Sequence, residues 1–232
     1  MGPFARAGVV LGAVGMLFLP MIGRAQEDLP AETLAQSTPL FAFRGQGNSP
    51  ALLLTRSGNA ENQDPRVLLS TRDGWRLIQL PEELHNTSWA WAGRMLDGGE
   101  IWGITEGMAD GRAYLYFVSS GNGGRAWKLR GYLPKVSRFA VVDTVGMSKN
   151  GKGTLVLRLD EDSSADAPRL GHYVYLTKNG GREWSTPMYS SGRPLPPSDV
   201  LVPSDQTFTD PVPPSADAWQ KILRDYAPPA EG

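Results

Sequence analysis

The amino-acid sequence predicts an all-β fold made of about three repeated antiparallel units, followed by a proline-rich strap and one short C-terminal helix. Short apolar runs rich in β-branched and aromatic residues recur between Ala51 and Thr177 and are separated by glycine turns. A phrase containing Asn-Gly-Gly occurs twice, beginning at Ser120 and again at Thr177. Between these points no long segment has the 3.6-residue period of a helix.

The first 25 residues are typical of a secretion signal. Arg6 gives a cationic start, residues 8–22 are apolar, and Gly23 and Ala25 are small residues at the positions that signal cleavage requires. The apolar run of about fifteen residues is interrupted by Pro20 and is shorter than the ~20 residues that span a bilayer. We therefore expect cleavage after Ala25, a secreted or periplasmic location and no membrane insertion of the mature chain.

A polar, acidic leader is expected over residues 26–38, and a β-repeat domain over residues 39–187. Alternating apolar and polar residues together with glycine turns, such as that at residues 149–153, favour antiparallel hairpins. The runs expected to form strands are residues 51–55, 66–71, 100–105, 113–120, 154–159 and 172–177.

Residues 188–232 are expected to form an extended strap, because 10 of the chain's 19 prolines lie between Pro187 and the C-terminus and proline supplies no backbone N–H. Near its end, residues 216–226 have the spacing of an amphipathic helix. This helix could dock on the chain's own core or be offered to a groove on a partner. Its apolar face is formed by Trp219, Ile222, Leu223 and Tyr226.

The repeated phrase marks three units, at residues 41–80, 89–133 and 139–187. A period near fifty residues of antiparallel strands is the spacing of β-propeller blades. In each phrase a side-chain oxygen of Asp or Asn can accept hydrogen bonds from N–H groups just ahead of it. The glycines that follow can adopt the positive φ that a tight turn requires, and the Trp can fold back over the hairpin.

These phrases resemble Asp-boxes, the bacterial neuraminidase repeats found in sialidases, sortilin-type receptors and other β-propellers. The first copy is partial, since Trp75 replaces the second glycine and Ile78 replaces the tryptophan. The resemblance implies an Asp-box β-propeller-like arrangement of about three blades, in which the box is a structural element away from the ligand site. The matching residues are Thr71, Asp73 and Gly74; Ser120, Asn122, Gly123, Gly124 and Trp127; and Thr177, Asn179, Gly180, Gly181 and Trp184.

The composition argues against several classes of function. The chain has no cysteine and a formal net charge of −1, and it has no basic block of the kind that binds nucleic acid. His85 and His172 are the only histidines, which leaves little for a serine triad or a zinc site. We expect no cofactor and no metal, with Ca²⁺ at the acidic loop of residues 160–166 as the alternative.

A sialidase-like reaction would need an arginine cluster for the substrate carboxylate, a nucleophile and an acid. The segment nearest to the family's arginine motif contains Arg44, but Ile-Pro does not follow it. Three units are also fewer than the six blades of that family. We therefore expect no catalytic residues.

A ligand site is predicted at an aromatic cluster in the second unit. Residues i and i+2 of a strand share a face, so Trp89 and Trp91 are expected side by side, either in the core or as a platform for a sugar or peptide. The candidate ligand-binding residues are Trp89, Trp91, Trp102, Arg44, Arg94 and Glu106.

The leading hypothesis is an exported, non-catalytic Asp-box module that binds a protein or carbohydrate ligand or acts in assembly. The alternatives are a sialidase-like glycoside hydrolase, degenerate or active, and an inhibitor or immunity-like partner of an extracytoplasmic enzyme. Three blades would leave two sheet flanks uncovered. The chain's own tail could cover them, or a second copy could close the ring as a homodimer.

Overall fold

The computed structural model describes residues 37–45, 49–58, 63–72, 74–95, 99–161, 168–194, 202–203, 206–207 and 216–226. The predicted secretion signal, most of the predicted leader, Asp73 and residues 162–166 of the acidic loop lie outside these residues. Ser37 and Thr38, at the end of the predicted leader, belong to the first strand.

Twelve strands form three antiparallel sheets of four consecutive strands each. Sheet A contains β1 (Ser37–Phe43), β2 (Leu52–Gly58), β3 (Gln63–Thr71) and β4 (Gly74–Ile78). Sheet B contains β5 (Thr87–Arg94), β6 (Ile101–Ala109), β7 (Arg112–Ser120) and β8 (Lys128–Pro134). Sheet C contains β9 (Val141–Met147), β10 (Gly153–Leu159), β11 (Gly171–Thr177) and β12 (Met188–Ser190). The prediction of a mostly β chain with three repeated antiparallel units is confirmed.

A short 3₁₀ helix, η1 (Glu82–Leu84), links sheets A and B, and the helix α2 (Ala216–Tyr226) lies near the C-terminus. The prediction of one short C-terminal helix is confirmed, and the structure describes it over residues 216–226.

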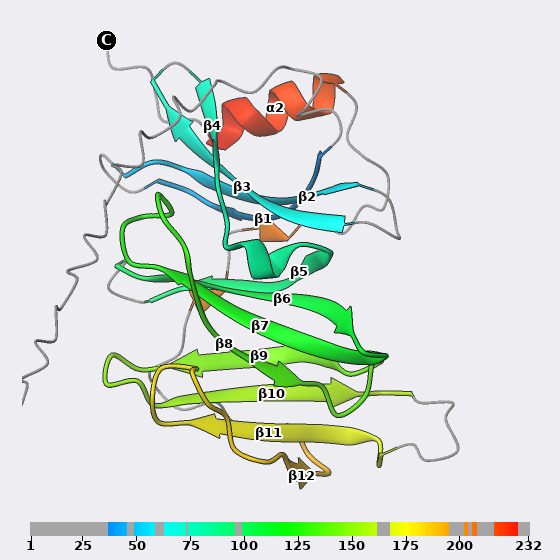
Figure 1. The fold of residues 1–232 in the computed structure, drawn as a ribbon. Helices are drawn as coiled ribbons and strands as arrows, with labels where there is room; N and C mark the ends of the chain where they lie inside the picture. Colours follow the sequence, from blue (N-terminus) through cyan, green and yellow to red (C-terminus); the bar gives the residue numbers. More distant parts are fainter. Residues whose placement is uncertain are drawn as a thin grey trace, which may run out of the picture.

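The three sheets are stacked face to face, with α2 on the outer face of sheet A (Figure 1). One buried cluster joins sheet A to sheet B and includes Leu54 and Val118. A second joins sheet B to sheet C and includes Phe117 and Leu157. The interior is therefore divided into layers between neighbouring sheets, as expected for elements with one apolar face each.

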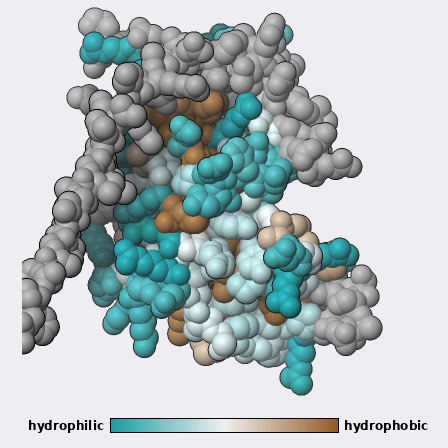
Figure 2. Space-filling model, viewed as in Figure 1, coloured by the Kyte–Doolittle hydropathy of each residue, from teal (hydrophilic) through white to brown (hydrophobic). Residues whose placement is uncertain are grey.

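The helix closes the outer face of sheet A. Trp219 is 2% exposed and Tyr226 is 5% exposed, and both pack with Leu53, Leu68 and Trp75 of the sheet. Hydrophobic residues gather where α2 meets this sheet (Figure 2). Of the two alternatives for this helix, the structure has the one in which it docks on the chain's own core.

The described residues of the proline-rich segment lie beside the first strands of the sheets at three places. Arg193 Nε donates to Asp143 Oδ2 of β9 at 3.0 Å. The two-residue strand β13 (Val202–Pro203) then pairs with β5, and β14 (Gln206–Thr207) pairs with β1. The tail thus adds a fifth strand to sheet B and to sheet A.

The outer face of sheet C is more open. Leu176 is 42% exposed and Met188 is 50% exposed, and within the described residues no helix packs on this face. Among all the residues that the structure describes, no helix is both long enough and apolar enough to cross a membrane.

Candidate functional site

The second box forms a self-capped turn between β7 and β8. Ser120 Oγ donates to Asn122 Oδ1 at 2.9 Å, and the same Oδ1 accepts the Ala126 N–H at 2.9 Å. The Gly124 N–H donates to Ser120 Oγ at 2.9 Å. Gly123 and Gly124 have φ of 69° and 86°, the left-handed region that favours glycine. The turn is therefore held by its own side chains.

The third box repeats this geometry between β11 and β12. Asn179 Oδ1 accepts the Glu183 N–H at 3.0 Å and the Thr177 hydroxyl at 3.1 Å, and the Gly181 N–H donates to Thr177 Oγ1 at 3.1 Å. Gly180 and Gly181 have φ of 69° and 75°.

The first copy lies at the corresponding place between β3 and β4. Thr71 Oγ1 donates to the Gly74 carbonyl at 3.0 Å, and Gly74 has a φ of 132°. Asp73 is outside the described residues. Each phrase therefore connects the third and fourth strands of its sheet.

The boxes also contact the preceding sheet. A Cβ on Gly124 would come within 2.5 Å of Leu52 in sheet A, and one on Gly181 would lie 3.4 Å from Trp102 in sheet B. Trp127 is 8% exposed in the cluster between sheets A and B. Trp184 is half-buried and lies 4.7 Å from the Phe117 ring of sheet B. These residues link neighbouring sheets as well as closing hairpins.

The predicted pairing of Trp89 and Trp91 on one face is wrong. The register of β5 against β6 shifts between them, so that Trp89 lies opposite Thr105 and Trp91 lies opposite Ile104. This β-bulge inserts one residue and places the rings in different layers. Trp89 packs between sheets A and B, whereas Trp91 packs between sheets B and C.

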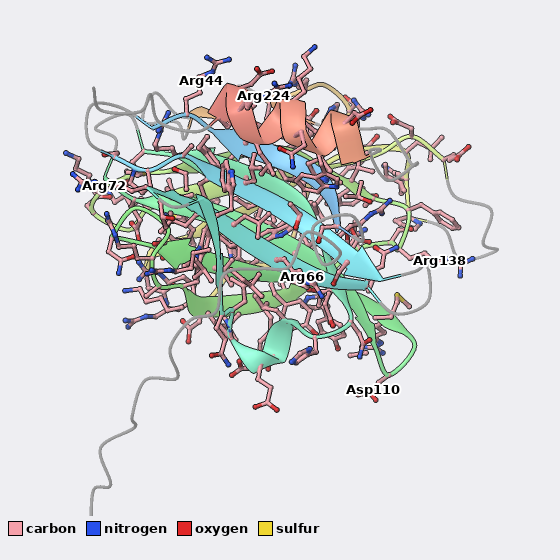
Figure 3. All side chains as sticks on the ribbon, turned by 90° about the horizontal axis from the view of Figure 1, so that it is seen from above. Arg44, Arg66, Arg72, Asp110, Arg138 and Arg224 are labelled. Carbon is pink, nitrogen blue, oxygen red and sulfur yellow. The ribbon has the colours of Figure 1, made fainter. Side chains whose placement is uncertain are left out.

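The six candidate ligand-binding residues do not converge on one site. Arg44 is exposed and lies 5.3 Å from the Tyr226 ring of α2, as its position beside α2 in Figure 3 illustrates. Arg94 donates to the Arg44 carbonyl at 3.2 Å. Glu106 binds Lys135 Nζ at 2.5 Å. Of the six, only Trp102 lines the cleft described next.

A cleft of about 400 Å³ opens between sheets B and C, within the usual range for small-ligand sites. The Gly180 N–H donates to the Gly151 carbonyl at 2.8 Å, which joins the two hairpin turns of sheet C on one side of the cleft. From sheet B and its loops the lining residues are Met95, Gly99, Glu100, Trp102, Gly121 and Arg130, and from sheet C they are Met147, Ser148, Lys149, Gly151 and Gly180.

Arg130 is the central polar residue of the cleft. The pairing of β8 with β7 shifts register next to Phe117 and Val118, opposite the segment that contains Arg130. A bulge of this kind re-aims a side chain. The Arg130 guanidinium lies 5.2 Å from the Trp102 ring, donates to Ser119 Oγ at 2.7 Å and forms an ion pair with Glu100.

The lining of the cleft combines the Arg130–Glu100 ion pair with apolar side chains and exposed backbone. Arg130 and Glu100 are 18% and 29% exposed at their side chains, and Trp102 is 3% exposed. Among the described residues, the buried Trp102 Nε1 has no hydrogen-bond partner. Met95 and Met147 add adaptable apolar surface. Such a cleft suits a ligand of mixed polarity that brings a hydrogen-bond acceptor.

The sequence predictions named neither Arg130 nor Glu100 as a site residue, and they gave the turn at residues 149–153 only as a hairpin turn. Ser148 Oγ donates to Asn150 Oδ1 at 2.5 Å, and the Lys152 N–H donates to the same oxygen at 3.2 Å. The sequence Ser-Lys-Asn-Gly repeats the start of the box phrase, and this signal could have identified the side-chain capping of the turn. Among the described residues, no cluster of three His, Asp or Glu side chains could hold a metal ion.

Comparison with known proteins gives few matches. No protein-family model matches the chain, and no curated protein is similar to it in sequence. One similar solved structure comes from work on the GH130 family of mannoside phosphorylases, which is said to contain glycoside hydrolases that target β-1,2-mannosidic linkages in Candida mannan. Its sequence identity to this chain is 9% and the TM-score is 0.38, and the match covers 72% of this chain and 51% of that chain. Another is a glycosyl hydrolase from Bacteroides ovatus, with 11% identity, a TM-score of 0.36, and coverage of 72% and 52%. The present chain spans about half the length of these two structures.

Proposed function

We propose that the protein is an exported, non-catalytic Asp-box module, and that the cleft between sheets B and C binds its protein or carbohydrate ligand. In this proposal the three sheets are blades of a propeller-like arc. The three phrases at equivalent turns support kinship with Asp-box proteins, and the N-terminal sequence supports export.

The observation that carries the proposal is the placement of Arg130. Burying part of an arginine and a carboxylate is costly unless both are paired, and here a bulge, Ser119 and Glu100 together fix the guanidinium over Trp102. Planar guanidinium groups held in this way recognise acceptor groups with defined geometry. A binding role accounts for a cleft that has polar groups fixed in advance.

Glycoside hydrolysis is less well supported by the same residues. Most glycosidases need two carboxyl groups about 5–10 Å apart. Glu100 is the only Asp or Glu among the described residues that line the cleft, and it is already engaged with Arg130 and with the Ser119 hydroxyl at 2.9 Å. Arg44, the candidate arginine, lies away from this cleft.

The test pairs binding with turnover. A glycan array and a peptide array would be screened with the secreted protein, and hits would be measured by titration calorimetry. Arg130→Met removes the charge but keeps most of the volume, and we expect it to weaken binding about tenfold or more, because it breaks hydrogen bonds to a charged group.

The matched control is Arg112→Met, at an exposed residue of the β6–β7 hairpin outside the cleft. Affinity should stay within about twofold of the parent protein in this variant, as expected for a surface substitution. Fluorogenic sialosides and a panel of other glycosides, including β-1,2-mannosides, would be assayed in parallel. If the protein turns over a glycoside and Glu100→Gln or Arg44→Ala abolishes this activity, the non-catalytic assignment is wrong. If the Arg130 and Arg112 variants bind the ligand equally well, the cleft is not the binding site.

A further inference from the structure

The first strands of the three sheets differ in how their free edges are used. Strand β1 is extended by β14, and β5 is extended by β13, whereas sheet C ends at β9. Among the described residues, no strand pairs with the second edge of β9. An unpaired edge presents backbone N–H and C=O groups that bind another extended chain.

The described part of the tail contacts sheet C without adding a strand to β9. Arg193 contacts Asp143 of β9, so the chain reaches this strand before it reaches β5. The residues that follow include Pro194, Pro196 and Pro197. Proline has no N–H to donate to a ladder. Among the described residues of the tail, pairing begins at Val202, on sheet B.

Strand β9 also lacks the usual protection of an edge. Natural edges are commonly blocked by lysine, proline or an unpaired charge, but β9 has the sequence VVDTVGM. Its one charged residue, Asp143, is only 8% exposed at its side chain and is paired with Arg193 and Arg158. Val141 is 46% exposed, and Phe139 just before it is 38% exposed.

We infer that the free edge of β9 is a docking site for an extended segment of a partner protein, which adds to sheet C as β13 and β14 add to sheets B and A. Backbone groups of an edge recognise an extended peptide backbone and not a sugar or a helix. The exposed side chains of Val141 and Phe139 favour apolar residues at the matching positions of the partner. The site lies along β9, whose last residue, Met147, also lines the proposed cleft, and it adds an assembly role to ligand binding.

The experiment uses the full secreted chain and a synthetic peptide copying β10, acetyl-TLVLRL-amide. This sequence already pairs with β9 on its other side, from Thr154 opposite Gly146 to Arg158 opposite Val141. Two further forms of the peptide carry N-methyl groups on alternate amides. Hydrogen exchange of β9 should slow about tenfold or more with the parent peptide and with only one methylated form, because a paired strand shows alternate amides to its partner.

A pair of variants separates the edge from the open face of the same sheet. Val141→Lys places a charge on the edge, and we expect it to weaken peptide binding about tenfold. Leu176→Lys changes a residue of similar exposure on β11, which lies inside the sheet, and should leave affinity within about twofold.

Several results would overturn the inference. They are slow exchange throughout β9 in the free protein, no protection by any peptide form, equal protection by both methylated forms, or equal effects of the two lysine variants. Protection that rises with protein concentration, together with a dimer mass, would identify a second copy as the occupant and would also overturn it.

Discussion

Asparagine stands at the acceptor position of both Asn-Gly-Gly turns, and the hydrogen bonds explain how each turn uses it. The required feature is one acceptor oxygen, which Asn122 and Asn179 supply. At the third box the amide does more, because Asn179 Nδ2 donates to Glu183 Oε2 at 3.1 Å. An aspartate there would place two carboxylates together.

This difference gives a prediction at the residue level. Asn122→Ala should lower the free energy of unfolding by about 1–2 kcal/mol, because two donors lose their acceptor, whereas Asn122→Asp should cost much less. Asn179→Asp should be clearly worse than Asn122→Asp because Glu183 repels the new charge. Urea unfolding of the three variants would check this, and an equal cost for the two Asp variants would contradict it.

Residue types with a fixed local role could be predicted from the sequence, whereas residues placed by register could not. Gly180 and Gly181 have the positive φ expected from the turn. The faces of Trp89 and Trp91 depend on one inserted residue in β5, which alternation alone does not reveal. The orientation of the Arg130 side chain depends on another register shift, so the residues that line the cleft could not be predicted from the sequence.

At the level of elements, the six strands expected from the sequence are the middle strands of the three sheets. These are β2, β3, β6, β7, β10 and β11. A middle strand has neighbours on both sides and reads as a nearly continuous apolar run. Most outer strands carry more exposed residues, as the pattern of β8 shows with Lys128 and Tyr132, and their apolar signal is weaker. Strand β1 is the exception, because six of its seven residues are buried.

The helix gives the prediction for this scale. Trp219→Ala should detach α2 from sheet A, since a buried tryptophan contributes about 3–5 kcal/mol and a terminal helix can open locally without unfolding the rest. We expect fast hydrogen exchange in residues 216–226 and increased binding of a hydrophobic dye, with sheets B and C still protected. Lys221→Ala, at an exposed residue of the same helix, is the control, and global unfolding of the Trp219 variant alone would contradict local opening.

For the whole molecule, stacking of the sheets and packing of the tail both serve to cover apolar sheet faces and unpaired strand edges. A three-sheet stack has two outer faces and three sets of edges, and the tail covers one face with α2 and two edges with β13 and β14. Box residues then join the layers, as Gly181 does at Trp102. The outer face of sheet C is open, and among the described residues its first strand, β9, is the one first strand to which no tail strand is added, so we expect contacts with other molecules to concentrate there.

The joint between sheets B and C should also determine how stability responds to alkaline pH. Tyr175 is 1% exposed within this layer. Burial and, to a smaller extent, the neighbouring Tyr173 raise the pKa of Tyr175 from 10.0 to about 12. The hydrogen bond with the Val136 backbone acts in the opposite direction and lowers this pKa. Burial also raises the pKa of Tyr116 and of Tyr173.

Because the folded state holds these protons more tightly than the unfolded state, their contribution to stability is complete below pH 10 and is lost as the pH rises towards 12. The free energy of unfolding in urea should therefore be lower at about pH 11 than at about pH 8. Tyr175→Phe should cost about 0.5–1.5 kcal/mol at the lower pH through the lost hydrogen bond. The same variant should show a smaller alkaline loss than the parent, since residue 175 then has no proton to release on unfolding. An alkaline loss of equal size in both proteins would mean that Tyr175 does not ionise differently in the two states, and that the joint between sheets B and C is not sealed around it.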